Sequence, residues 1–255
     1  MNPPVLGVTA LTKHYGGVHA LDGVSFQIAR GELLALIGPN GAGKSTCFNI
    51  VNGQIRPDSG HVRLIGRDIT GLPPRRIARL GVGRTFQVAT VFGSMTALEN
   101  VQMALIAARG RVFGLCTSAR DVASEEALAL LEQTGMAAQA GRPAATLAYG
   151  DVKRLELSMA LAGDPILLLM DEPTAGMSAA ERQDMIVLVR QLTRARGLAV
   201  LFTEHSMDVV FGHADRVVVL ARGRLIADGS VEAVRDDPAV REVYLGAIPA
   251  AGSRA

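Results

Sequence analysis

The chain lacks the features that would place it in an oxidising compartment or inside a lipid bilayer. Its 255 residues include two cysteines, Cys47 and Cys116, which lie far apart without C-x-x-C spacing, so a disulfide framework or a zinc site is not expected. Apolar runs such as ILLLM at residues 166–170 are too short to span a bilayer, and the N-terminus has no signal-peptide pattern. We therefore expect a soluble protein of a reducing compartment, although one that could still dock on a membrane protein.

An excess of charge of one sign is also missing. The 26 basic and 24 acidic residues give a net charge of +2, whereas a dedicated nucleic-acid binder normally carries a basic stripe. No nucleic-acid partner is expected. Internal repeats, low-complexity tracts and Pro/Ser-rich linkers are absent as well. The length is sufficient for a substantial core, so the whole chain, 1–255, is predicted to form a single continuous domain with lobes.

The apolar pattern that remains predicts an α/β fold with a mostly parallel sheet. The stretches LGVTALTKHY and VSFQIA alternate apolar and polar residues, as half-buried antiparallel strands do. Residues 96–161 have helical periodicity, and two short helices and a tail are expected from residue 230. Further strands are predicted at residues 33–38, 62–66, 166–170, 199–203 and 216–221. The predicted strands thus come before and after a helical insert, and this order indicates a mostly parallel sheet with a helical lobe.

The stretch GPNGAGKST, residues 38–46, contains G-x-x-x-x-G-K-S between a buried strand and a helix, which is the context that a phosphate-binding loop requires. Its glycines allow backbone N–H groups to surround a phosphate. Lys44 is expected to reach the β- and γ-phosphates of a nucleotide, and the Ser45 hydroxyl to bind Mg²⁺. The alternative is a chance glycine-rich turn, which ordinary residue usage would produce on the order of a few per cent of the time.

Three further strand ends carry polar residues suited to nucleotide hydrolysis. Asp171 ends the strand of ILLLMDE and is expected to hold the hydration shell of Mg²⁺, while Glu172 could accept a proton from an attacking water. His205 follows the strand AVLFT, and Gln87 ends GVGRTFQ. Taken alone, Asp171 and Glu172 could be a pair of solvated acids that end a strand, and His205 could be a structural histidine. Because strand ends converge at the carboxyl edge of an α/β sheet, we expect these groups to meet there.

Together, the motifs GPNGAGKST, RTFQ, LAYGD, ILLLMDEPTAG and TEHSM resemble, in their order and separation, those of the ATP-binding subunit of ABC transporters over almost the full chain. The resemblance implies a P-loop NTPase (RecA-like) core, an N-terminal antiparallel β subdomain and a helical signature subdomain. Residues 1–88 and 162–229 would form the core with its antiparallel part, 89–161 the helical subdomain, and 230–255 the C-terminal helices and tail.

The resemblance also implies roles for individual residues. Glu172, His205 and Gln87 would be catalytic, and Ser45, Gln87 and Asp171 would contact Mg²⁺. Tyr15 would stack on adenine, and the signature residues Ala148, Tyr149 and Gly150 would bind the γ-phosphate of ATP held by a second cassette. The nucleotide itself would contact Gly38, Pro39, Asn40, Gly41, Ala42, Gly43, Lys44, Ser45 and Thr46.

Three positions depart from the family pattern. Ala148 replaces a serine and removes one hydroxyl donor, Asp151 replaces a glutamine and adds a negative charge, and Ser178 stands where an aspartate is usual at the dimer interface. A weaker grip on the partner's ATP is expected from the first two. None of the three touches Lys44 or Glu172, so hydrolysis is predicted to survive.

A narrower resemblance is to the branched-chain amino acid importer ATPases, specifically the one of their two ATPases that carries RTFQ. It rests on LAYGDVKRLELSMALA, MDEPTAGMS, the stretch from TEHSM to ADGS, and the ending VREVYLG; residues 109–121 resemble a short insertion of that subfamily. It implies two membrane-spanning permease subunits, a second ATPase subunit, a solute-binding protein acting indirectly, and a place at the cytoplasmic face of the membrane.

Several alternatives stay open at this point. Urea and short-chain amide importers share much of the pattern. A soluble ABC ATPase of DNA repair or translation usually carries a coiled coil or two fused cassettes, which this chain lacks. A non-ABC P-loop kinase or GTPase would leave LAYGD and His205 without a role.

Overall fold

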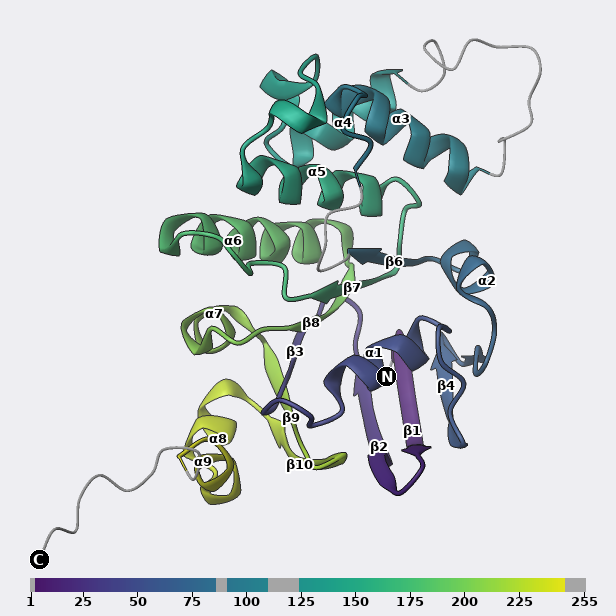
Figure 1. Cartoon of the computed structure of the whole chain (residues 1–255), viewed down its shortest axis with the longest axis vertical. Helices are drawn as coiled ribbons and strands as arrows, with labels where there is room; N and C mark the ends of the chain where they lie inside the picture. The colour runs from purple at the N-terminus through teal and green to yellow at the C-terminus, as the bar shows by residue number, and fades with distance from the viewer. Residues whose placement is uncertain (1–2, 86–90, 110–123, 246–255) are drawn as a thin grey trace, which may run out of the picture.

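The computed structural model describes residues 3–85, 91–109 and 124–245, and in it two sheets and a set of helices form the α/β fold that the sequence predicts (Figure 1). The strands are β1 (Leu6–Tyr15), β2 (Val18–Ile28), β3 (Leu33–Ile37), β4 (Ser59–Leu64), β5 (Arg67–Asp68), β6 (Val82–Thr85), β7 (Leu167–Asp171), β8 (Ala199–Thr203), β9 (Arg216–Ala221) and β10 (Arg224–Gly229). The helices are α1 (Lys44–Val51), α2 (Pro74–Arg79), α3 (Ala97–Ala108), α4 (Ser124–Gln133), α5 (Tyr149–Leu161), α6 (Ala179–Arg196), α7 (Met207–His213), α8 (Val231–Asp236) and α9 (Pro238–Leu245), with 3₁₀ turns at Ala137–Gln139 and Ala144–Thr146.

The central sheet has the strand order β10-β9-β3-β8-β7-β6, and its strands are parallel except for β10, which pairs antiparallel with β9. All residues of β3 and β8 are buried, as their continuous apolar runs predict. Alternate residues of β3 face two separate cores: Leu33 and Ile37 pack with the helices α3 to α7, while Leu34 and Leu36 pack on the side of α1 and the second sheet. The sheet is therefore covered on both faces.

The second sheet has the order β2-β1-β4-β5 and is antiparallel throughout. Val24, Phe26 and Ile28 alternate inward along β2, which confirms the half-buried pattern of this region. The strand predicted at residues 62–66 is shifted, because β4 begins at Ser59 and ends at Leu64. Ile65 has a φ of 45° and starts a turn instead of continuing the strand.

The helical stretch predicted from residue 96 to 161 is α3, α4 and α5, which form a separate layer above α6 (Figure 1). Thr96 caps α3 through a reciprocal pair of hydrogen bonds with Glu99, which explains why the helix begins there. The insertion suggested at residues 109–121 lies, apart from Arg109, outside the described residues. The two C-terminal helices expected from residue 230 are α8 and α9, and the tail beyond them is also outside the described residues.

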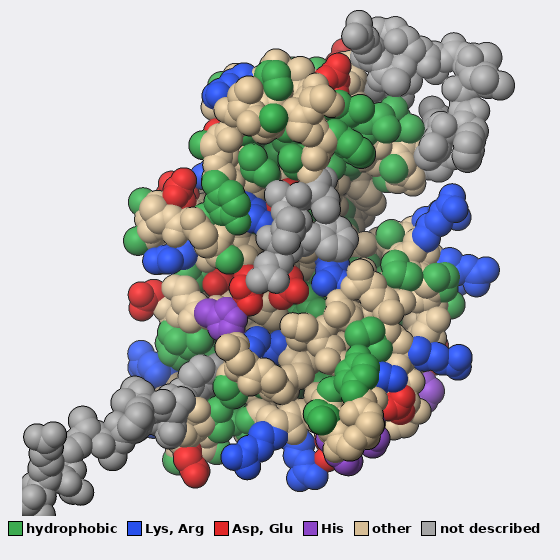
Figure 2. All heavy atoms as spheres, viewed as in Figure 1, with side chains coloured by type: hydrophobic (Ala, Val, Ile, Leu, Met, Phe, Trp, Pro, Cys, Tyr) green, Lys and Arg blue, Asp and Glu red, His purple; other side chains and the backbone are tan. Residues whose placement is uncertain are grey.

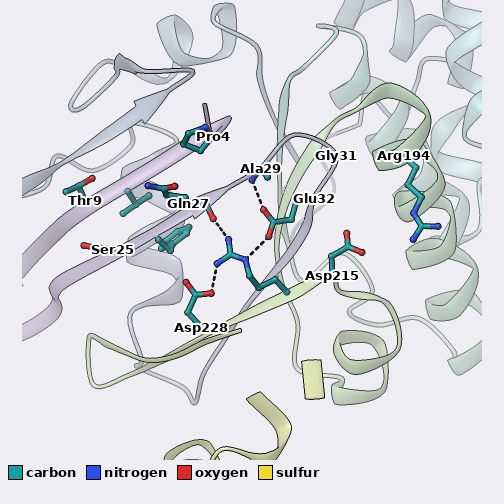
Figure 3. Close-up of a pocket in the computed structure, with 13 residues that line it drawn as sticks. Pro4, Thr9, Ser25, Gln27, Ala29, Gly31, Glu32, Arg194, Asp215 and Asp228 are labelled. Atoms are coloured by element: carbon teal, nitrogen blue, oxygen red, sulfur yellow. Dashed lines mark hydrogen bonds and ion pairs between the residues drawn. The ribbon is translucent and has the colours of Figure 1, made fainter. Parts of the chain in front are cut away.

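Arg216, at the start of β9, links the two sheets near the amino ends of β3 and β9. Its Nε donates to Glu32 Oε1 at 2.7 Å, and its other nitrogens pair with Asp228 and with the backbone carbonyl of Gln27 (Figure 3). Burial lowers the pKa of Arg216, but the hydrogen bonds that it donates to Glu32 and Asp228 outweigh the effect of burial, so the pKa is raised overall. A cavity of about 870 Å³ opens beside this ion pair. It lies at the amino ends of β3 and β9, the edge opposite the predicted nucleotide site.

Candidate active site

The predicted phosphate-binding loop connects β3 to α1, and its glycines are required by close approaches of the backbone. Gly43 has a φ of 104°, and a Cβ there would lie 2.3 Å from the carbonyl oxygen of Ala20. At Gly38 a Cβ would lie 2.2 Å from the carbonyl oxygen of Leu220. Gly41 also has a positive φ, of 78°, but faces open space. The loop is therefore tight on its protein side and open on the other, which suits a phosphate.

Lys44 opens α1 and is 9% exposed. Its Nζ donates to the carbonyl oxygens of Gly38 at 2.6 Å and Pro39 at 3.1 Å, so the ammonium group folds back over the loop. Burial lowers the pKa of Lys44, while the carboxylates of Glu172 and Asp171 oppose that shift. A cation on the concave side of the loop, next to the uncapped first turn of a helix, is the arrangement that binds an anion.

Asp171 and Glu172 follow one another at the end of β7, and Thr203 at the end of β8 holds both. The Thr203 hydroxyl donates to Asp171 Oδ1 at 2.7 Å and accepts the backbone N–H of Glu172 at 3.1 Å. Glu172 has a φ of 49°, a left-handed conformation that costs a residue other than glycine on the order of 1 kcal/mol. The hydrogen bonds from the Glu172 N–H to Thr203 hold the backbone in this conformation.

His205 lies just after β8, as predicted, and its Nε2 is 2.8 Å from Glu172 Oε1. The imidazole is 53% exposed and the Glu172 side chain 23% exposed, so the pair sits at the mouth of the site rather than in the core. A carboxylate oriented by an imidazole, with access to solvent, is suited to accept a proton from a water molecule.

The glycine loop, Asp171, Glu172 and His205 meet around a cavity of about 310 Å³ at the carboxyl ends of β3, β7 and β8, which confirms the predicted convergence for these three strands. Figure 2 shows acidic side chains and a histidine gathered together on this face, below the helical layer. The lining consists of Tyr15, Val18, Ala20, Asn40, Gly41, Ala42, Gly43, Lys44, Ser45, Thr46, Asp171, Glu172 and His205. Tyr15 is 48% exposed at the end of β1, and the Lys13 Nζ lies 5.6 Å from the centroid of its ring.

The signature residues Ala148, Tyr149 and Gly150 are not among the described residues that line this cavity. They start α5, where Ala148 is the N-cap and has no side-chain acceptor for the free N–H groups of the first turn. Gln87 lies outside the described residues. Ser178 is the N-cap of α6 and forms a reciprocal pair of hydrogen bonds with Glu181, a structural use of this serine that the sequence analysis missed.

Sequence reasoning also missed a buried carboxylate, Glu204, which is 5% exposed. Its Oε1 accepts the backbone N–H and the hydroxyl of Thr174 at 2.9 and 2.6 Å, and its Oε2 accepts the N–H of His205 at 3.2 Å. Glu204 thereby ties the loop after β7 to the loop that carries His205. The signal was present in TEHSM, where an acid directly precedes the histidine at the end of a buried strand.

The residues present fit ATP and Mg²⁺. The open side of the glycine loop, the Lys44 ammonium group and the first turn of α1 suit a triphosphate, and the Ser45 hydroxyl and Asp171 carboxylate are hard oxygen donors of the kind that Mg²⁺ prefers. In the part of the chain that the structure describes, no helix is long and apolar enough to cross a bilayer.

Two family models match the chain. The first, described as "ABC transporter", covers residues 21–175, and the second, "Branched-chain amino acid ATP-binding cassette transporter", covers residues 224–248. The high-affinity branched-chain amino acid transport ATP-binding protein BraF of Pseudomonas aeruginosa is 39% identical over 254 residues, covering 96% of this chain and 99% of the relative. Its counterpart LivG of Escherichia coli K12 is 37% identical over 253 residues, with 96% and 99% covered.

Solved structures agree with the fold. The crystal structure of an ATP-binding cassette of an ABC transporter in its ADP conformation has a TM-score of 0.86 and 32% identity, covering 96% of this chain and 99% of that one. A nucleotide-free ATP-binding cassette from an ABC transporter has a TM-score of 0.83 and 31% identity, with 95% and 99% covered. With a family model over more than half of its length and relatives that align along nearly all of it, the chain belongs to the ABC transporter family, as one of its ATP-binding and ATP-hydrolysing subunits.

Proposed function

We propose that this chain binds ATP with Mg²⁺ in the cavity at the carboxyl edge of the central sheet, and that hydrolysis there energises the uptake of branched-chain amino acids. The observation that carries the proposal is the convergence of the glycine loop, Asp171, Glu172 and His205 on one cavity. The solute is supported by the relatives, which are named as branched-chain amino acid transport proteins and align over nearly the whole chain.

In the proposed reaction, Glu172 accepts a proton from the attacking water while His205, 2.8 Å away, orients its carboxylate. Lys44 exchanges the loop carbonyls of Gly38 and Pro39 for the β- and γ-phosphate oxygens of ATP. Ser45 and Asp171 would hold Mg²⁺, with Gln87 as a further contact. When bound there, Mg²⁺ neutralises charge that develops on the transferred phosphoryl group.

A second ATPase subunit is proposed to complete the site. The free N–H groups at the start of α5 suit an anion, yet Ala148, Tyr149 and Gly150 are absent from the described lining of the chain's own cavity. A head-to-tail pair of cassettes would bring this helix end to the γ-phosphate of the partner's ATP. Asp151 in the first turn of α5 would weaken that grip, because it places a negative charge near a negative ligand.

One of the two permease subunits is proposed to dock on this chain, in a groove of about 570 Å³ between α2, β6, α3 and α5, and the other on the second cassette. Its walls combine small apolar residues such as Ala104 and Ala108 with Met159 and with two exposed arginines of α2, Arg75 and Arg79. Figure 2 shows basic side chains at this corner of the molecule. Docking there would place the subunit at the cytoplasmic face of the membrane, with a solute-binding protein acting only indirectly.

The test of the catalytic proposal is Glu172→Gln, which preserves the shape of the side chain but removes the base. Turnover is expected to fall by about a hundredfold to ten-thousandfold, while ATP binding is retained and a cassette dimer accumulates in size-exclusion chromatography with ATP. Glu132→Gln, at an exposed position on α4, is the control and is expected to behave as the native protein. Near-native turnover by Glu172→Gln would contradict the assignment of the base.

The test of the transport proposal is co-purification from detergent-solubilised membranes of the host, followed by uptake in proteoliposomes. Two polytopic membrane proteins, a second cassette and ATP-dependent uptake of leucine are expected. Uptake of urea or a short-chain amide in place of leucine would assign the alternative importer class. Recovery of the chain without any membrane protein would favour a soluble ABC ATPase.

A further inference from the structure

Arg84, on β6, lies between the nucleotide cavity and the proposed docking groove between α2, β6, α3 and α5. It lines the groove together with Gly81, Val82 and Gly83, and its guanidinium reaches the nucleotide site, where Nη2 lies 3.8 Å from Asp171 Oδ2. Asp171 itself lines the nucleotide cavity. A single side chain therefore connects the wall where a permease would dock with the carboxylate that would hold Mg²⁺.

The guanidinium is held in place by acceptors from the α1 region. Its Nη1 donates to Asn49 Oδ1 at 3.1 Å and to Gln54 Oε1 at 2.8 Å, and the side chain is 10% exposed. Asn49 lies on α1, the helix that the glycine loop opens. Burial lowers the pKa of Arg84 and the Asp171 carboxylate opposes this, yet an arginine stays charged at neutral pH.

Asp171 is thus contacted on both oxygens. The Thr203 hydroxyl donates to Oδ1 at 2.7 Å, and the Arg84 guanidinium faces Oδ2. The distance of 3.8 Å exceeds hydrogen-bond length, so the interaction with Oδ2 is electrostatic and changes gradually with the position of β6. β6 is an edge strand that pairs with β7 alone in the described sheet, which makes such a displacement less costly than for a central strand.

We propose that Arg84 is a positioning residue that couples the docking groove to the magnesium-binding carboxylate. It lowers the affinity of Asp171 for Mg²⁺ because its guanidinium competes for Oδ2. The orientation of the Asp171 carboxylate then depends on the position of β6, which carries Arg84. The groove half of this inference rests on the proposed docking of permeases, whereas the effect on Mg²⁺ rests on the subunit alone.

The first experiment titrates Mg²⁺ into the isolated subunit at a fixed concentration of mant-ADP and follows nucleotide fluorescence at equilibrium, without turnover. Arg84→Met removes the competing cation, so the half-saturating Mg²⁺ concentration is expected to fall by roughly threefold to tenfold. Arg84→Lys keeps a cation at the same place and is expected to stay within about twofold of the native value. Arg79→Met, which removes an exposed arginine of the same groove, is the matched control and leaves the midpoint unchanged.

The second experiment compares solute-stimulated with basal ATPase activity in the assembled transporter. A lysine has one ammonium group and cannot contact Asn49, Gln54 and Asp171 at the same time. Arg84→Lys is therefore expected to lose most of the solute stimulation of ATPase activity, although its half-saturating Mg²⁺ concentration stays within about twofold of the native value. A purely structural role would lower thermal stability and move neither the midpoint nor the stimulation ratio.

Two results would overturn the inference: an Arg84→Met midpoint equal to or above the native value, or native stimulation in Arg84→Lys. If the native subunit neither assembles with permeases nor responds to them, the proposed function and the groove half of the inference fail together. The Mg²⁺ shift in the isolated subunit would then still decide whether Arg84 acts on Asp171.

Discussion

Glu204 offers the sharpest test of how the catalytic loops are held. Its carboxylate accepts three hydrogen bonds, two from Thr174 and one from the N–H of His205, and both Glu204 and Thr174 are buried, at 5% and 1% exposure. In Glu204→Ala the amide and hydroxyl of Thr174 lose their acceptor inside the protein. Each such orphaned donor costs about 1–3 kcal/mol, so the free energy of unfolding is expected to fall by about 3–5 kcal/mol.

Glu204→Gln distinguishes hydrogen bonding from simple packing. The amide oxygen can still accept both bonds from Thr174, but the amide nitrogen then faces the His205 N–H, which was 3.2 Å from Oε2. The loss of that weak bond predicts a cost of about 1 kcal/mol. Because His205 is shifted, turnover is expected to fall by about tenfold or more even where the fold is retained.

The assay is urea unfolding followed by circular dichroism, with ATPase activity measured on the folded variants. Thr174→Val removes one donor, and a double-mutant cycle with Glu204→Ala, which removes the acceptor, is expected to give a coupling energy above about 0.5 kcal/mol. If Glu204→Ala costs less than about 1 kcal/mol, or Glu204→Gln costs as much as Glu204→Ala, the hydrogen bonds are not what holds the two loops together.

Three further predictions concern stability and reactivity. Arg216→Met removes the 2.7 Å ion-pair partner of Glu32, whose side chain is 14% exposed, and is expected to lower the free energy of unfolding in urea by about 2 kcal/mol. The control, Arg224→Met, changes a side chain that is 72% exposed and is expected to lower it by less than about 1 kcal/mol. Equal losses in the two variants would contradict this account. Burial lowers the pKa of His213 below its ordinary 6.5, so the unfolded chain binds more protons below that pH and stability is lost as the pH falls from 6.5 towards the folded pKa. Melting temperatures of His213→Gln should show less of this acid loss than the native protein, and parallel profiles would refute it. Burial raises the pKa of the Cys47 thiol to about 12, so peptide mapping should find it unreacted with iodoacetamide at about pH 8 until the chain is unfolded.

The local chemistry of the nucleotide site was readable from the sequence. The stretch from Gly38 to Ser45 places its glycines, lysine and serine within a few consecutive residues, and the preceding apolar run specifies a buried strand. Asp171 ends one strand of the same kind and His205 follows another, so the parallel order of the sheet was enough to predict that they meet. The periodicity of the stretch between 96 and 161 likewise specified its helices, because helix periodicity depends only on near neighbours.

Contacts between segments that lie far apart in the sequence could be found only from the tertiary structure. Thr203 and Glu204 act on Asp171, Glu172 and Thr174 from a different strand about thirty residues away, and no spacing rule in the sequence links them. Arg84 read as part of the RTFQ motif, yet its guanidinium turns to Asp171 and Asn49. The shift of β4 and the use of Ser178 as a helix cap also depend on backbone conformation.

The sequence by itself determined the family and the residues predicted to contact phosphate, because these depend on motifs that are compact along the chain. The tertiary structure alone decided how those residues are held: the strained conformation of Glu172 supported by Thr203, the buried carboxylate of Glu204, and the position of Arg84 between cavity and groove. Motifs are local in the sequence, whereas orientation comes from hydrogen bonds and charges that only packing brings within reach.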